Sequence, residues 1–151
     1  MLSQGSGYAI TAMGYVASAG GRAVLVKDIA DAAEVPGPYL AKLIHVLARK
    51  GLVTTQRGVG GGVALARPAT EISLHDVCLA LDDPAIQTRC MLAEADCSDE
   101  RGCPAHKFWA VEREKIQSFL KRTMVADIAA FEAIRRWKAN GHRPPTEYHG
   151  P

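Results

Sequence analysis

Three cysteines and one histidine lie close together in a polar segment of this 151-residue sequence. They are Cys90, Cys97, Cys103 and His106, with the spacing C-x6-C-x5-C-x2-H. Thiolates hold iron–sulfur clusters, and imidazole can replace a thiolate on one iron. The short step from Cys103 to His106, at the start of a predicted helix, is expected to bring both side chains into one ligand site. The spacing therefore indicates a metal centre.

The residue types alone leave the occupant of this site open. A tetrahedral zinc ion uses the same ligands, and a metal-free thiol switch needs only two of the cysteines. Chance clustering is the remaining alternative, and His106 has the alternative role of capping a helix or bonding a carbonyl. The fourth cysteine, Cys78, lies on a separate predicted helix and is expected in the core, because free cysteine is among the most buried residue types.

The chain has the features of a cytoplasmic globular protein. Its N-terminus, MLSQGSGYAI, has no basic segment leading into an uninterrupted apolar run, and no later run reaches the roughly 18 residues of a membrane helix. A composition of 48% hydrophobic and 23% charged residues argues against wholesale disorder. Because thiols stay reduced in the cytoplasm, the clustered cysteines indicate metal or redox chemistry before disulfides.

Two short predicted helices joined by a tight turn resemble a helix-turn-helix. A first helix is expected over residues 5–19. Val26, Ile29, Ala30 and Ala33 lie at helical spacing and predict a second, short amphipathic helix within VLVKDIADAAEV. The prolines in VPGP, residues 35–38, predict the turn, because proline restricts the residue before it. The helical pattern resumes at Tyr39 and stops at Gly51.

A strand-like pattern follows this pair of helices. Two runs, Leu52–Arg57 and Gly62–Arg67, flank the segment GVGGG, whose glycines tolerate the positive φ of a turn, so a hairpin is predicted. A phosphate-binding loop is rejected, because no Lys-Ser/Thr pair follows and no strand-to-helix context surrounds the glycines. A hairpin directly after a helix-turn-helix is a wing.

The C-terminal half is predicted to be helical around the cysteine segment. Ser73 and Asp76 have the spacing of a capping box, and a long helical region over 104–138 is expected to break near Thr123. Its apolar seam lies far from the winged-helix core in the sequence pattern, so it is expected to pack on a second subunit of a homodimer. The residues predicted for this dimer interface are Trp109, Ile116, Phe119, Leu120, Ile128 and Phe131.

The predicted fold class is mainly α with a small β-hairpin. We expect a winged helix-turn-helix DNA-binding domain at residues 1–82 and a cysteine-rich loop at 83–106. A dimerisation helix region at 107–138 and a flexible tail at 139–151 complete the chain.

Double-stranded DNA is the predicted partner of the second helix and the wing. The N-terminal residues of that helix meet base edges in the major groove, and an arginine on the wing suits a narrow minor groove. Residues 1–70 hold seven Lys/Arg against three Asp/Glu, a balance that favours a polyanion but also fits ordinary surface variation. Tyr39 has the alternative of packing inward, and Lys42 that of a solvated lysine. The predicted DNA contacts are Thr11, Gly37, Pro38, Tyr39, Lys42, Arg57, Gly58, Gly60 and Gly61.

Three stretches carry a resemblance to a known family. GYAITAMGYVA, DIADAAEVPGPYLAKLIHVLARKGLV and RGVGGGVALARPATEISLHDV resemble the winged-helix regulators typified by the iron–sulfur cluster regulator IscR, a family that includes NsrR and RirA. The resemblance runs from about residue 5 to residue 138, and the RGxxGG wing followed by LARP is its specific part. It implies a homodimeric transcription regulator, in many members with one iron–sulfur cluster per subunit held through three cysteines.

The resemblance also bears on the cluster type. Relatives with a histidine three residues after the last cysteine resemble the 2Fe–2S type, and His106 occupies that place. Relatives with a 4Fe–4S cluster use another fourth ligand, in some an acidic residue near the N-terminus, where residues 4–8 here offer no carboxylate. The resemblance therefore favours 2Fe–2S over 4Fe–4S.

Two departures limit what the resemblance transfers. The first cysteine gap here is six residues, where IscR has five, and Ala41 follows YL where relatives often carry glutamate. The cluster geometry and the DNA target are therefore not carried over.

The expected function is that of a DNA-binding regulator, not an enzyme, that senses iron–sulfur status, redox state or nitric oxide. A regulator with structural zinc or a thiol switch is the alternative. A small iron–sulfur electron carrier is a further one, although it leaves the wing without a role.

Overall fold

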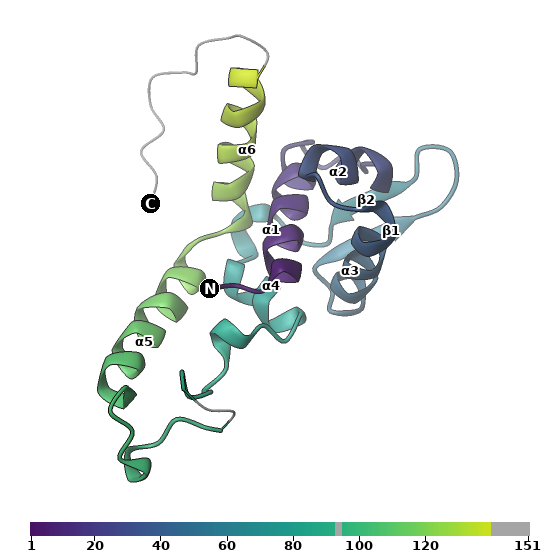
Figure 1. Ribbon diagram of the computed structural model, residues 1–151. Coiled ribbons are helices and arrows are strands. Elements are labelled where there is room, and N and C mark those ends of the chain that lie inside the picture. Colours follow the sequence, from purple (N-terminus) through teal and green to yellow (C-terminus); the bar gives the residue numbers. More distant parts are fainter. Residues whose placement is uncertain (93–94, 140–151) are drawn as a thin grey trace.

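The computed structural model describes residues 1–92 and 95–139 of the chain (Figure 1). The predicted class is confirmed, because these residues form six α-helices and a two-stranded antiparallel hairpin. The helices are α1 (Gln4–Ala17), α2 (Val26–Ala33), α3 (Gly37–Arg49), α4 (Leu74–Ala80), α5 (His106–Arg122) and α6 (Val125–Ala139). The strands are β1 (Val53–Gln56) and β2 (Gly62–Leu65), and the short 3-10 turns are η1 (Ala69–Glu71), η2 (Pro84–Ile86) and η3 (Asp99–Arg101).

Helices α2 and α3 form the predicted helix-turn-helix. Glu34 ends α2 in the left-handed conformation at φ 55°, which reverses the chain before Pro36. Helix α3 begins at Gly37, two residues before the predicted start, because proline fits the first turn of a helix. Leu40, Ile44 and other apolar residues of α3 face the core that α1 shares.

The predicted wing is also present, and it is anchored at its base. Val53 lies opposite Leu65 and Gln56 opposite Gly62 across the two strands. Val24 adds a further bridge, exchanging two backbone hydrogen bonds of 2.8 and 2.7 Å with Val63. A Cβ at Gly62, where φ is +141°, would lie 2.5 Å from the Val24 carbonyl oxygen, so this position requires glycine.

The C-terminal helical region breaks at Thr123 and Met124, as the sequence predicts. The Asp127 carboxylate accepts a 2.8 Å hydrogen bond from the Met124 N–H, which caps the new helix. Backbone bonds from Leu74 to Thr123 and from Val125 to Ile72 tie the break to the segment before α4. The capping box of Ser73 and Asp76 is confirmed at the start of α4.

The expectation that this region lies far from the core is wrong for α6 and for part of α5. Helix α6 packs along α1 so closely that a Cβ on Gly14 would lie 2.5 Å from Ile128 Cγ2 (Figure 1). Leu120 is 2% exposed and belongs to the core of its own chain, and Ile116 and Ile128 pack against that core. The break at Thr123 folds α6 back onto α1, and α5 packs on α4. Leu120 is therefore removed from the predicted dimer interface.

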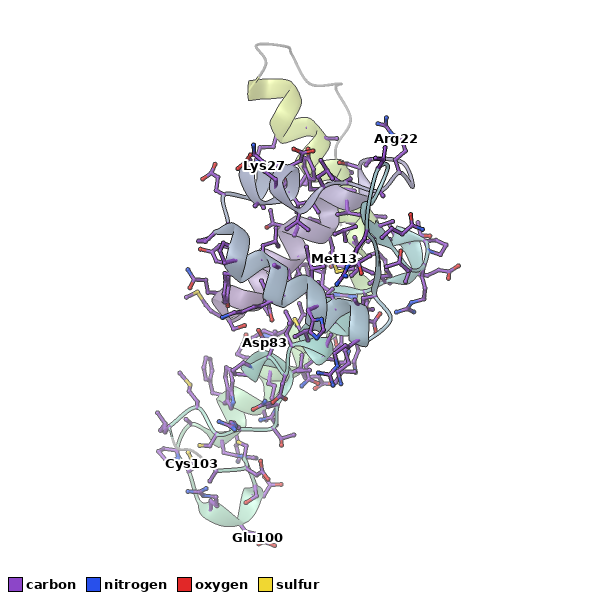
Figure 2. All side chains as sticks on the ribbon, turned by 90° about the vertical axis from the view of Figure 1, so that its right-hand side faces the viewer. Met13, Arg22, Lys27, Asp83, Glu100 and Cys103 are labelled. Carbon is purple, nitrogen blue, oxygen red and sulfur yellow. The ribbon has the colours of Figure 1, made fainter. Side chains whose placement is uncertain are left out.

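The buried carboxylate of Asp83 joins the start of α1 to the segment that leads to the cysteines. Asp83 accepts hydrogen bonds from the Ser3 N–H (2.9 Å) and the Ala85 N–H (2.8 Å), and it also bonds the Ser6 side chain. Burial alone raises the pKa of Asp83, but these hydrogen bonds outweigh it and hold the pKa below its usual value. In Figure 2, Asp83 lies where the helical body meets the extension that carries Glu100 and Cys103.

Two further predictions concern the C-terminal tail and the absence of a membrane-spanning helix. The tail predicted at 139–151 lies outside the described residues, apart from Ala139 at the end of α6. Within residues 1–92 and 95–139, no helix is long and apolar enough to span a bilayer.

Candidate metal centre and nucleic-acid interface

The cysteine loop, Cys90–His106, is described except for residues 93 and 94. Backbone bonds of 2.8 Å run from the Cys90 N–H to the Ala95 carbonyl and from the Cys97 N–H to the Thr88 carbonyl, so residues 88–90 lie beside residues 95–97. These bonds place Cys90 and Cys97 on two neighbouring segments of the loop. None of the four cysteines, all within the described residues, is in a disulfide.

The imidazole of His106 joins two other polar groups of the loop. Its Nδ1 lies 3.0 Å from Cys97 Sγ, and its Nε2 lies 2.9 Å from the Asp99 carboxylate. Toward Cys103, the nearest cysteine in sequence, His106 makes a backbone bond of 3.0 Å from its N–H to the carbonyl. The structure therefore pairs the His106 side chain with Cys97, where the sequence suggested Cys103.

Helix α5 supports the segment before the cysteines along one face. Trp109 Nε1 donates a 2.9 Å hydrogen bond to the Arg89 carbonyl, and Gln117 Nε2 donates one of 3.1 Å to the Ile86 carbonyl. His106, Trp109 and Gln117 recur at helical spacing, so one face of α5 carries both the candidate ligand and the anchors. Trp109, predicted for a dimer interface, is thus engaged within its own chain.

The residue types of the loop suit an anionic metal cluster, although the four side chains do not meet at one point. Among the described residues no three Cys, His, Asp or Glu side chains are placed to hold a metal ion. The Cys97–His106 pair is assembled, and Cys90 and Cys103 are partly buried in the same loop. On the same α5 face, Arg113 Nη1 is buried without a hydrogen-bond partner among the described residues. An unmatched cationic donor suits an occupant held by thiolates, which carries negative charge.

Cys78 is separate from this site and chemically different. It is fully buried on α4, which confirms the predicted core position. Burial raises the pKa of the Cys78 thiol to about 11, with the nearby charge of Asp83 adding to the rise. Since the thiolate is the metal ligand and nucleophile, Cys78 stays an inert thiol at neutral pH.

The predicted DNA-reading residues of α3 lie on its exposed side. Lys42 is exposed, and Tyr39 is 40% exposed with its ring edge against Tyr8 of α1 at 6.0 Å. His45 and Arg49, which were not among the predicted contacts, are exposed on α3 at helical spacing from Lys42 and lie on the same side of the helix. The sequence pattern could have identified both residues, because they lie on the polar side of the same amphipathic helix as Lys42.

The wing presents Arg57 beside a glycine turn. Arg57 is exposed just after β1, and Gly58 and Gly60 have φ of +91° and +75°. A Cβ at Gly61 would lie 2.5 Å from the Gln56 carbonyl oxygen, so the turn has no room for a side chain at this position. Thr11 is half-buried beyond the first turn of α1, and its contact with DNA stays a prediction.

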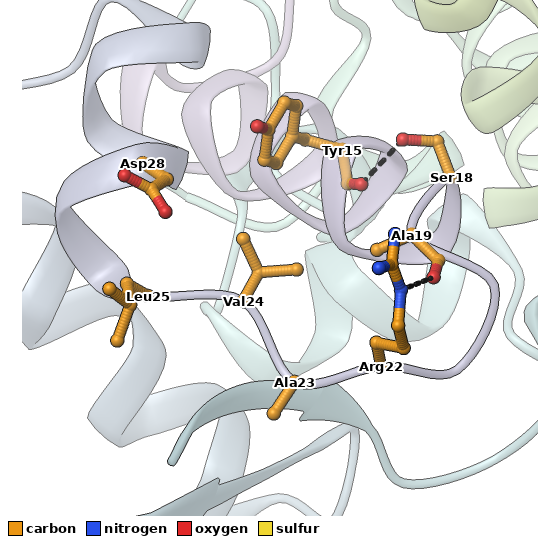
Figure 3. A pocket seen from close by; sticks show the side chains of 8 residues that line it. All are labelled: Tyr15, Ser18, Ala19, Arg22, Ala23, Val24, Leu25 and Asp28. Carbon is orange, nitrogen blue, oxygen red and sulfur yellow. Dashed lines mark hydrogen bonds between the residues drawn. The ribbon is translucent and has the colours of Figure 1, made fainter. Parts of the chain in front are cut away.

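A cavity of about 350 Å³ lies between the end of α1 and the start of α2 (Figure 3). Two of its polar side chains are engaged with the local backbone: Ser18 Oγ donates to the Tyr15 carbonyl and Arg22 Nε to the Ala19 carbonyl. The cavity is remote in sequence from both the cysteine loop and the wing, and we assign it no ligand.

Comparisons with known proteins agree with this geometry. The family model Rrf2, described as an iron-dependent transcriptional regulator, matches residues 2–130. A putative HTH-type transcriptional regulator of Aquifex aeolicus is 32% identical over 127 residues, covering 83% of this chain and 88% of its own. The HTH-type transcriptional regulator IscR of Yersinia pestis is 36% identical over 123 residues, covering 80% and 74%. The structure of CymR, the global cysteine regulator of B. subtilis, superposes with a TM-score of 0.70 at 25% identity, covering 87% and 97%.

Replacing Arg57 by alanine tests the wing contact. We expect about a tenfold weaker affinity, about 1.4 kcal/mol, for a duplex site selected from random sequence by the wild-type protein, because the wing loses its only guanidinium at the tip. Fluorescence anisotropy at fixed salt measures it. The control is Arg67→Ala, which removes the same charge at the far end of the hairpin and should change affinity much less. Equal losses in the two variants would contradict the assignment.

Proposed function

The chain belongs to the Rrf2 family of transcriptional regulators, and we propose that it is an iron–sulfur sensor whose bound cluster, of the 2Fe–2S type, sets its affinity for an operator. Its winged helix-turn-helix and its relatives identify a DNA-binding regulator, not an enzyme. The observation that carries the sensor proposal is the Cys97–His106 contact of 3.0 Å, in a loop with two further cysteines. The similarity to IscR supports it.

The proposed ligands are Cys90, Cys97, Cys103 and His106. A bound cluster would supply a centre that can be oxidised, nitrosylated or lost. Its proposed ligands are spread from residue 90 to residue 106, so a bound cluster would fix these parts of the loop relative to one another. The Arg113 guanidinium, whose Nη1 is buried on the same face of α5 as His106, would offset the negative charge of the thiolates.

A chain of contacts connects the segment before the cysteine loop to the recognition helix α3. Gln117 holds the Ile86 carbonyl, and Asp83 holds Ala85 of the same short turn together with Ser3 at the start of α1. At that end of α1, a Cβ on Gly5 would lie 3.1 Å from the Tyr39 hydroxyl of α3. A change in the loop therefore acts on the segment against which the recognition helix rests.

We also propose that the regulator acts as a homodimer through the exposed side of α5. Phe108, Val111 and Phe119 are about half exposed or more and recur at helical spacing, with a groove beside Val111 along the same helix. Of the residues predicted for the dimer interface, Phe119 and also Phe131 of α6, 50% exposed, have exposed side chains. Two copies would place two recognition helices on half-sites about one DNA turn apart.

A regulator with structural zinc, a 4Fe–4S cluster or a metal-free thiol switch is the alternative. The Cys97–His106 pair favours a metal, since a thiol switch needs no histidine. Zinc and iron use the same residue types, so their distinction requires metal and sulfide analysis.

Ligand replacement tests the cluster directly. After anaerobic purification or reconstitution, we expect iron, acid-labile sulfide and visible absorption in the wild type and a loss of most of each in Cys97→Ala. Cys78→Ala is the matched control and should keep the full cluster, because Cys78 lies in the core away from the loop. Zinc without sulfide in the wild type, or a full cluster in Cys97→Ala, would contradict the proposal.

Charge on α5 tests the dimer. Phe119→Asp is expected to shift the molar mass in light scattering from that of two chains to that of one, because a buried carboxylate in an apolar interface costs several kcal/mol. Leu79→Asp, a similar change at an exposed leucine of α4, should leave the mass unchanged. A wild-type protein of single-chain mass, or a dimeric Phe119→Asp, counts against this interface.

A further inference from the structure

We infer that His106 binds iron through Nδ1, and that Asp99 is the residue that positions it by accepting the Nε2–H. This inference rests on the proposed iron–sulfur site and names the atoms within it. Nδ1 lies 3.0 Å from Cys97 Sγ, whereas Nε2 lies 2.9 Å from Asp99 Oδ1, so the two ring nitrogens face different groups.

The Asp99 contact decides which nitrogen can act as a ligand. A metal-binding imidazole is neutral, with one N–H and one lone pair. A carboxylate only accepts, so the proton that faces Asp99 is held on Nε2 and the lone pair lies on Nδ1. Metal-bound histidines are commonly oriented by a carboxylate in this way, which also raises the basicity of the ligand.

The distance between Nδ1 and Cys97 Sγ is already close to that of two ligands on one metal. A tetrahedral ion bound at about 2.3 Å to sulfur and about 2.1 Å to nitrogen holds these atoms about 3.6 Å apart. The observed 3.0 Å requires an opening of only about half an ångström. Cys97 and His106 are therefore suited to share one iron.

The local chain places Asp99 for this role. Asp99 opens the turn η3, and Gly102, at φ +59°, then reverses the chain toward Cys103 and the start of α5. The Asp99 side chain is 96% exposed while that of His106 is 17% exposed. A hydrogen bond to so exposed a carboxylate contributes little to folding stability, so we expect a replacement of Asp99 to change the orientation and basicity of the imidazole while the fold is kept.

The test labels the protein with histidine carrying ¹⁵N at δ1 only or at ε2 only. Pulsed EPR of the reduced cluster then reports which nitrogen is bound to iron. We expect strong ¹⁵N coupling from the δ1 label and only weak, remote coupling from the ε2 label. His106→Ala should abolish the strong coupling, which excludes the other histidines of the chain as its source.

The outcomes separate this inference from the proposed function. Strong coupling from the ε2 label, or a cluster with no strong nitrogen coupling, overturns the inference while the iron–sulfur protein stands. A wild-type protein that holds no cluster overturns the proposed function and the inference with it.

A second measurement isolates Asp99. The reduction potential of the cluster is expected to rise in Asp99→Asn, because the imidazole loses its carboxylate partner and donates less electron density. Glu100→Gln removes the same charge from the neighbouring position without touching the His106 contact, and it should raise the potential less. Equal shifts in both variants, or no shift in Asp99→Asn, would show that Asp99 does not position the ligand.

Discussion

The hydrogen bonds of the buried Asp83 carboxylate fix the position of the winged helix-turn-helix relative to the segment that leads to the cysteine loop. It accepts N–H bonds from Ser3, before α1, and from Ala85, in the turn that leads to the cysteines. A buried charge is tolerated only when it is fully hydrogen-bonded, so both segments are fixed in position relative to one group. The hydrogen bonds keep the pKa of Asp83 low, and the carboxylate therefore remains ionised and holds both segments at neutral pH.

This arrangement explains how a loop at the far end of α5 can affect a helix that reads DNA. The cysteine loop extends away from the winged helix in Figure 1, so direct contact between them is not the route. Gln117 and Asp83 instead hold the turn before the loop, and Asp83 holds the start of α1, on which Tyr39 of α3 rests. Each step is a short-range contact between packed elements, and the proposed signal needs no element beyond them.

Local patterns in the sequence predicted much of the fold, and contacts between distant segments account for the misses. Periodicity located the helix-turn-helix and the wing, and short-range rules located the capping box at Asp76 and the break at Thr123. The return of α6 onto α1, which brings Ile128 against Gly14, depends on the angle at that break, and no local pattern encodes it. The burial of Leu120 likewise follows from the packing of α5 on α4, an element distant in sequence. The Asp83 network and the Asp99–His106 contact were missed because their residues are ordinary loop carboxylates until the chain folds.

In the proposed regulator, a cluster bound in the cysteine loop changes the affinity for DNA. The most direct measurement compares the anaerobic affinities of the cluster-loaded and chelator-stripped protein for one selected duplex site, at the same ionic strength. Coupling free energies between sites are typically about 1–3 kcal/mol, so we expect the two dissociation constants to differ by about fivefold or more. Equal dissociation constants for the two forms would contradict it.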